Sequence, residues 1–167
     1  YALALASAVM LAGAIDQWPL ARRAIYPLLV ASQTLPIFAI APLLAIWFGF
    51  GLLPKVLIVT LVCFFPIVVA TVSGLHTADR EILGLVRGMG ASKRQLFLKV
   101  RVPAAVPSVI SGMKISATYS VIGAVIAEWT GASHGLGLYL LRASNSFQTD
   151  QVFAVIVVIA ALSIGLF

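Results

Sequence analysis

Residues 56–75 read VLIVTLVCFFPIVVATVSGL, a run without one charged side chain. A helix needs about 20 mostly apolar residues to cross the hydrocarbon core of a bilayer. In that core every backbone N–H and C=O group must be paired, and a helix pairs them within one segment. The run therefore predicts a membrane-spanning helix, and it places the chain among the all-α integral membrane proteins.

The composition of the whole chain supports the same fold class. Hydrophobic residues make up 62% of the 167 residues, and charged residues only 10%. A soluble domain is about half apolar and about a quarter charged, so this chain lacks the charges that a water-facing surface needs. The net charge of +6 is unevenly spread along the chain. That distribution argues against a general nucleic-acid-binding surface and indicates membrane topology instead.

Four more segments have the apolar character of a span: residues 1–15, a part of 24–54, 104–127 and 151–167. The uncharged stretch within 24–54 is too long for one upright helix. Its three prolines predict an interfacial segment followed by a kinked span. The chain starts at Tyr1 rather than Met and ends within an apolar run, so we expect truncation at both ends. The prediction is a single transmembrane domain, residues 1–167, with about five spans.

The charged loops between these segments predict the orientation. Residues 78–102 carry six basic residues and two acidic ones, and loops rich in Lys and Arg stay in the cytoplasm. Alternation then places residues 16–24, with two arginines, inside as well, and Lys55 and Arg142 outside. Eight basic residues inside against two outside predict an outer N-terminus and an inner C-terminus. The six basic residues of the first loop are Arg80, Arg87, Lys93, Arg94, Lys99 and Arg101.

The loop of residues 78–102 also contains two helix signals. Apolar residues at helical spacing predict a short amphipathic helix over 79–89, with Ile82, Leu85, Val86 and Met89 on one face. Gly90 stands where a left-handed residue often ends a helix. Ser92 and Gln95 have the form of a capping box that opens a second short helix. A compact loop of two short helices is suited to bind in a groove on a partner protein. From the residues alone, a basic helix lying on anionic lipid is an equal alternative.

The spacing after Gly90 carries a resemblance to a known family. Gly90, nine residues and then Val100-Arg101-Val102-Pro103 resemble the signature loop of binding-protein-dependent ABC importer permeases. That signature runs Glu-Ala-Ala, three residues, Gly, nine residues, then Ile, any residue, Leu and Pro. The Gly and Pro spacing matches, and Val100 and Val102 replace the apolar pair. Gly84-Leu85-Val86 stands where the family has Glu-Ala-Ala.

Other stretches extend the resemblance over nearly the whole chain. Residues 42–49, 87–92 and 127–137 are similar to the branch that imports sulfonates, taurine, nitrate and thiamine-precursor pyrimidines. Several separate motifs of this chain therefore agree with that branch in their order and spacing. Residues 127–129 and 147–154 look most like the members for thiamine-precursor pyrimidines. That solute is expected, with sulfonates, taurine and nitrate as the alternatives.

The resemblance implies a permease core like that of methionine importers, with about five transmembrane helices and residues 78–102 as its cytoplasmic coupling loop. It implies a multi-pass protein of the bacterial inner membrane, surrounded by membrane lipid and without a nucleic-acid partner. The implied partners are cytoplasmic ATPase subunits, an extracytoplasmic solute-binding protein and a second permease copy, most simply in a homodimer. The implied ATPase-coupling residues are Ile82, Leu85, Val86, Arg87, Met89, Gly90, Ala91 and Ser92.

The chain itself is expected to be a transport subunit rather than an enzyme. It contains no Gly-Lys-Ser/Thr sequence of the kind that cradles nucleotide phosphates, so ATP hydrolysis is expected in a separate partner. No cofactor or metal site is expected either. The pathway candidates in the predicted span 104–127 are Lys114, Ser116, Ser120 and Gly123.

Each pathway candidate has an alternative explanation. A charge inside a span often marks a water-filled route, but the Lys114 side chain is also near enough to the cytoplasmic surface to reach it. The small residues line a route between two permease copies, let helices approach closely within one chain, or do both. Nearby, Glu128 either accepts hydrogen bonds from the following loop or faces water, and a structural role is expected. His76 is expected to be solvated.

Two other classes of protein are the rivals. A secondary transporter or channel without an ATPase should carry acidic residues within its spans, and these spans hold almost no ionisable group besides Lys114. An intramembrane hydrolase needs converging nucleophile and base side chains. Ser133 and His134 are neighbours in the sequence, so their side chains are expected to point apart. Cys63 stands alone, without metal-ligand spacing around it.

Overall fold

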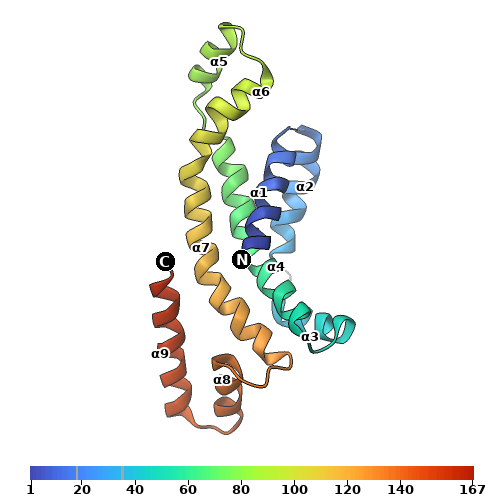
Figure 1. Ribbon diagram of the computed structural model, residues 1–167, viewed down its shortest axis with the longest axis vertical. Helices are drawn as coiled ribbons and strands as arrows, with labels where there is room; N and C mark the ends of the chain where they lie inside the picture. Colours follow the sequence, from blue (N-terminus) through green and yellow to red (C-terminus); the bar gives the residue numbers. More distant parts are fainter. Residues whose placement is uncertain (18, 35) are drawn as a thin grey trace.

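Every regular element of the computed structural model is a helix within the described residues, which are 1–17, 19–34 and 36–167 (Figure 1). The predicted all-α fold class is therefore confirmed. Arg22 counts toward the predicted charge asymmetry, but the side chains of 17–22 lie outside the described part. The helices are α1 (Ala2–Gln17), α2 (Pro19–Ser32), α3 (Ile37–Phe48), α4 (Leu52–Leu75), α5 (Arg80–Gly88), α6 (Lys93–Leu96), the π-helical turn η1 (Phe97–Arg101), α7 (Val102–Trp129), α8 (Leu136–Asn145) and α9 (Thr149–Gly165).

The centre of the molecule is the long antiparallel pair of α4 and α7 (Figure 1). Small residues let the two backbones approach closely, as is usual between helices in lipid. At Gly112 of α7, an added Cβ would lie 2.5 Å from the Cβ of Ala70 and 3.1 Å from the carbonyl oxygen of Pro66. No side chain fits there without moving α4, so this glycine sets how near the two helices lie.

The second main contact of α4 is with α1, which packs against it. Ala8 and Ala12 of α1 are fully buried in a cluster with Ile67 and Val68 of α4. The alanines repeat every fourth residue and make a flat helix face, so larger residues of α4 can pack on it. α2 lies beside α1, α8 packs near the C-terminal end of α7, and α9 runs back beside α7 (Figure 1).

Two helices are long and apolar enough to cross a membrane: Leu52–Leu75 and the continuous helix Lys93–Trp129. A third span results if the bent pair Arg23–Ser32 and Ile37–Phe48 counts as one. Ala2–Asp16 and Thr149–Gly165 are apolar but shorter. The structure thus contains two or three candidate spans by length and composition, where the sequence predicted about five.

The segment within 24–54 is broken more sharply than the predicted kink. Arg23–Ser32 and Ile37–Phe48 make an angle of 93°. Pro36 is the N-cap residue, with extended backbone, that directly precedes α3. Because proline lacks the N–H that an interior helical residue donates, it favours a new helix start over a continuation. Pro27 and Pro42, by contrast, lie inside α2 and α3.

The helix predicted to follow Ser92 is present, but the prediction that it is short is wrong. Instead of stopping before the membrane, the helix runs without a break from Lys93 to Trp129, over 37 residues. The turn η1 makes this possible, with Val102 donating its N–H to the carbonyl of Phe97, five residues back. A π-helical turn changes the pairing just ahead of Pro103, which has no N–H of its own to donate. The loop is therefore joined directly to α7.

Candidate coupling loop and transport pathway

The predicted amphipathic helix is present as α5, and its start is capped. The carboxylate of Asp79 accepts a hydrogen bond of 2.8 Å from the N–H of Glu81. Glu81 lies in the first turn and Arg87 in the last, where each charge opposes the partial charge of the helix end. None of the nine residues of α5 is buried. Its fold is thus held by its ends rather than by a core.

An apolar face of α5 is open to the surroundings. Ile82, Leu85 and Met89 are 52%, 67% and 78% exposed, and Val86 is half-buried. Burying a side chain of this size is favourable by about 1.5–3 kcal/mol. Three such side chains on two turns make a face that is more stable when another surface covers it.

The turn after α5 is fixed by backbone hydrogen bonds. Gly90 has φ +86°, so the predicted left-handed conformation is confirmed. Its N–H donates to the carbonyl of Arg87 at 3.0 Å, and the N–H of Ala91 donates to that of Val86 at 3.3 Å. This pair of bonds is the Schellman motif, which ends a helix through a left-handed glycine.

The next helix then starts at once through the predicted capping box, which is also confirmed. The N–H of Ser92 donates to Oε1 of Gln95 at 2.8 Å, and the N–H of Gln95 donates to Oγ of Ser92 at 3.3 Å. Both donors would otherwise be unpaired at the helix start. The loop is therefore a tight turn, closed by hydrogen bonds, between α5 and the long helix that begins at α6.

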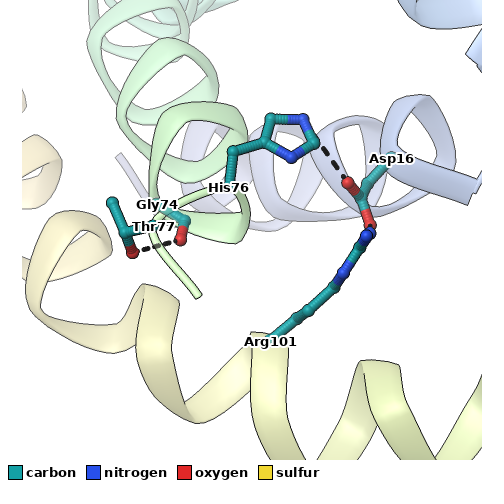
Figure 2. Close-up of polar contacts among 5 residues, drawn as sticks. All are labelled: Asp16, Gly74, His76, Thr77 and Arg101. Carbon is teal, nitrogen blue, oxygen red and sulfur yellow. Dashed lines mark hydrogen bonds and ion pairs between the residues drawn. The ribbon is translucent and has the colours of Figure 1, made fainter. Parts of the chain in front are cut away.

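A buried carboxylate ties this corner to α1. The side chain of Asp16 is 2% exposed, and its Oδ2 lies 2.8 Å from Nη1 of Arg101 in η1. Its Oδ1 lies 3.6 Å from Nε2 of His76, which follows α4. Figure 2 shows Arg101 and His76 approaching Asp16 from different elements, with Thr77 bonded to the carbonyl of Gly74 nearby. His76, predicted to be solvated, is an exposed residue, and its side chain, which is 28% exposed, also lies within ion-pair distance of Asp16.

Two of the four pathway candidates are packed against α4. Ser116 is fully buried, and its hydroxyl donates to the carbonyl of Cys63 at 2.9 Å, while the Cys63 thiol donates back to the carbonyl of Ser116 at 3.5 Å. A Cβ added at Gly123 would lie 3.3 Å from the Cα of Val59. Both residues therefore belong to the contact between α4 and α7 within one chain.

The other two candidates are more accessible. Lys114 is exposed, and its Nζ lies 5.5 Å from the centre of the Phe167 ring, within the range of a cation–π contact. Ser120 is half-buried, and its hydroxyl donates to the carbonyl of Ala117 at 2.6 Å. Lys114 and Ser120 are thus the two pathway candidates whose side chains remain at least partly exposed.

The C-terminal end of α7 is joined to the following segment by hydrogen bonds. Oε2 of Glu128 accepts a hydrogen bond of 2.6 Å from the N–H of Gly137, and Nε1 of Trp129 donates to the carbonyl of Gly137 at 2.9 Å. The structural role predicted for Glu128 is confirmed. In the same loop the prediction for Ser133 and His134 is wrong, because Oγ and Nδ1 lie 2.6 Å apart. The two residues stand in irregular backbone, where neighbouring side chains need not diverge, and both are exposed.

Comparison with known proteins decides the family. A family model described as the binding-protein-dependent transport system inner membrane component matches residues 4–167. The chain belongs to this family. The resemblance found in the loop and in the stretches around it is therefore confirmed, and the permease is a multi-pass protein of the inner membrane.

Individual relatives of the permease transport different solutes. It is 45% identical over 142 residues to the formylaminopyrimidine transport permease protein ThiX of Halalkalibacterium halodurans, covering 85% of this chain and 57% of the relative. It is 34% identical to the aliphatic sulfonates transport permease protein SsuC of Bacillus subtilis, a putative assignment, covering 81% and 49%. It is 30% identical to the taurine transport permease protein TauC of Escherichia coli, covering 87% and 53%. The permease thus spans about half the length of these relatives.

The cluster around Asp16 was missed in the sequence of the permease. Asp16 stands in a predicted basic inner loop, 85 residues away from Arg101 along the chain. The only available signal was that it is the sole acidic residue before Asp79. A lone carboxylate near a membrane surface is buried only when a cation reaches it, but the sequence does not indicate which cation does so.

Proposed function

We propose that this permease is the membrane-spanning subunit of an ATP-driven solute importer, and that cytoplasmic ATPase subunits dock on the exposed face of α5. The observation that carries the proposal is this face of Ile82, Leu85 and Met89, open on a helix whose two ends are both fixed by hydrogen bonds. A short rigid helix with unburied apolar residues suits a groove in a partner. The relatives are transport permeases, which supports the assignment.

In this proposal the coupling loop acts as a lever. A displacement of α5 reaches α6 through the Gly90 turn and the Ser92 cap, and it continues along the unbroken helix to Trp129. The ion pair between Arg101 and Asp16 extends the same movement to α1. A docked ATPase can therefore shift the spans that surround the pathway without touching the solute. Lys114 and Ser120 are the residues of α7 that we assign to that pathway, between two copies of the permease.

We further propose a five-span topology, with α1, the pair of α2 and α3, α4, the helix from α6 to α7, and α9 as the spans. The basic loop with α5 and α6 lies at one end of the long helices, and α3 and α8 lie at the other (Figure 1). The eight-to-two distribution of basic residues places the end with α5 in the cytoplasm.

Cysteine labelling tests this topology. In a Cys63→Ala background, an impermeant thiol reagent added to intact cells should label Ser144→Cys and should not label Lys99→Cys. Both positions are exposed, so access depends on the side of the membrane alone. After the membrane is opened, both should react, which controls for reactivity. Labelling of Lys99→Cys from outside intact cells would refute the topology.

For the solute, we propose a thiamine-precursor pyrimidine such as a formylaminopyrimidine. The support is the identity of 45% to a formylaminopyrimidine permease, against 34% and 30% to the sulfonate and taurine permeases. An extracytoplasmic binding protein would deliver the solute to the end of the permease that holds α8. Transport of labelled pyrimidine by the assembled importer, with sulfonate and taurine as competitors, separates the three solutes.

A charge placed on the open face of α5 tests ATPase docking. Leu85→Asp should reduce co-purification of the ATPase with the permease about tenfold or more, because a buried unpaired carboxylate costs several kcal/mol at an apolar contact. Arg80→Asp is the matched control, since it introduces the same side chain into the first turn of the same helix, where a negative charge is favourable. Equal recovery of the ATPase with both variants would exclude the face of α5 as the docking surface.

A further inference from the structure

A basic hollow lies behind the coupling helix. Its volume is about 740 Å³, and it is bounded by the C-terminal end of α1, by α5, by α6 and by η1. Among its lining residues the cations outnumber the anions four to one. Asp16, the one carboxylate of the lining, is already bonded to Arg101. The four cationic lining residues are Arg87, Lys93, Arg94 and Arg101.

The hollow is separate from the apolar face that we assign to the ATPase, although Arg87, one of the implied coupling residues, belongs to its lining. Leu83 and Arg87 line it, and these residues are one helical turn apart on α5. Ile82, Leu85 and Met89 do not line it and stand on a different side of the helix. An anion in the hollow can therefore be bound while the apolar face is covered by a partner.

An apolar groove adjoins the hollow. Its volume is about 550 Å³, and it runs between α1, α4 and α7. Met10 and Gly13 line it from α1, Leu75 from α4 and Val106 from α7. Phe97 belongs to the lining of both the groove and the hollow. A site therefore exists that is cationic at the cytoplasmic end of the helices and apolar along the spans.

We propose that one anionic phospholipid binds here, with its phosphate among the cations of the hollow and an acyl chain in the groove. Arginine side chains bind phosphate through paired N–H groups. Basic pockets between transmembrane helices on the cytoplasmic side are suited to anionic headgroups. A free phosphate would fill only the hollow and leave the groove without an occupant, so the two features together favour a lipid. The bound lipid would connect α5 to α1 and η1, and it would stabilise the position of α5 on the side away from its apolar face.

Native mass spectrometry of the purified full-length permease tests the site. Phosphatidylglycerol should be retained by the wild-type chain in preference to phosphatidylcholine. The double variant Lys93→Gln/Arg94→Gln should lose roughly thirtyfold in apparent affinity for phosphatidylglycerol, since each of the two cations near an anionic headgroup contributes on the order of 1 kcal/mol. The control Arg80→Gln/Lys99→Gln removes the same charge from exposed positions outside the hollow, and it should leave this affinity unchanged.

A second arm separates a lipid from free phosphate. Val106→Trp fills the groove, and it should weaken the retention of phosphatidylglycerol while the hollow keeps its charge. Excess inorganic phosphate should not displace the lipid. Displacement by phosphate together with normal retention by Val106→Trp would identify the hollow as a site for a free anion and would overturn the proposal. Equal lipid affinity of the two charge variants would overturn it as well. The proposal does not depend on ATPase docking, so either can fail alone.

Discussion

Gly90→Val should abolish most of the transport while the permease stays in the membrane at normal abundance. Gly90 has φ +86°, a conformation that a β-branched residue adopts only at a cost of about 1–3 kcal/mol. A Cβ at this position would meet no other atom within 4 Å, so the effect comes from the backbone and not from a clash. To relieve the strain, the chain must abandon the hydrogen bonds from Gly90 and Ala91 that close α5. The apolar face then turns away from the ATPase.

The measurement is solute uptake by the assembled importer, with ATPase co-purification and membrane abundance scored in parallel. Gly88→Val is the matched control. Gly88 also has open space around it and lies only two residues away, but it has helical backbone that valine can adopt. Uptake should be lost in the first variant and largely kept in the second. Normal uptake by Gly90→Val at normal abundance would mean that this loop is only a basic connector.

Gly112→Leu should lower the stability and the abundance of the permease itself. The new Cβ would lie 2.5 Å from the Cβ of Ala70 and 3.1 Å from the Pro66 carbonyl oxygen, so α4 and α7 would have to separate. Overpacking of a close contact typically costs about 1–3 kcal/mol, and occasionally more. Separation of the pair would also strain the hydrogen bonds between Ser116 and Cys63, one turn farther along.

The midpoint of thermal denaturation in detergent, together with the amount of protein in the membrane, measures this effect. Gly165→Leu is the control, because it adds the same atoms to a helix of the permease where nothing lies within 4 Å. We expect a clear decrease in the midpoint for Gly112→Leu and little change for Gly165→Leu. An unchanged midpoint for Gly112→Leu would show that the contact between α4 and α7 is looser than the structure indicates.

The sequence by itself determined the membrane class, the helical fold, the family, both ends of α5 and the start of α6. These features depend on composition or on residues a few positions apart. The Asp79 cap, the Gly90 turn and the Ser92 capping box each close within five residues, so the local chain specifies them. The break before α3 also has a local cause, because Pro36 has no N–H to continue a helix and stands at the N-cap of the next one.

Only the tertiary structure decided which side of each span meets another helix. The apolar residues of α7 are spread around the whole helix, so their pattern does not distinguish a packing face from a lipid face. Ser116 and Gly123 therefore could not be separated from Lys114 and Ser120 until α4 was in place. The pairing of Asp16 with Arg101 could not be predicted from the sequence for a related reason. A buried charge needs a partner nearby in space, and the fold alone brings residues 85 positions apart within 2.8 Å.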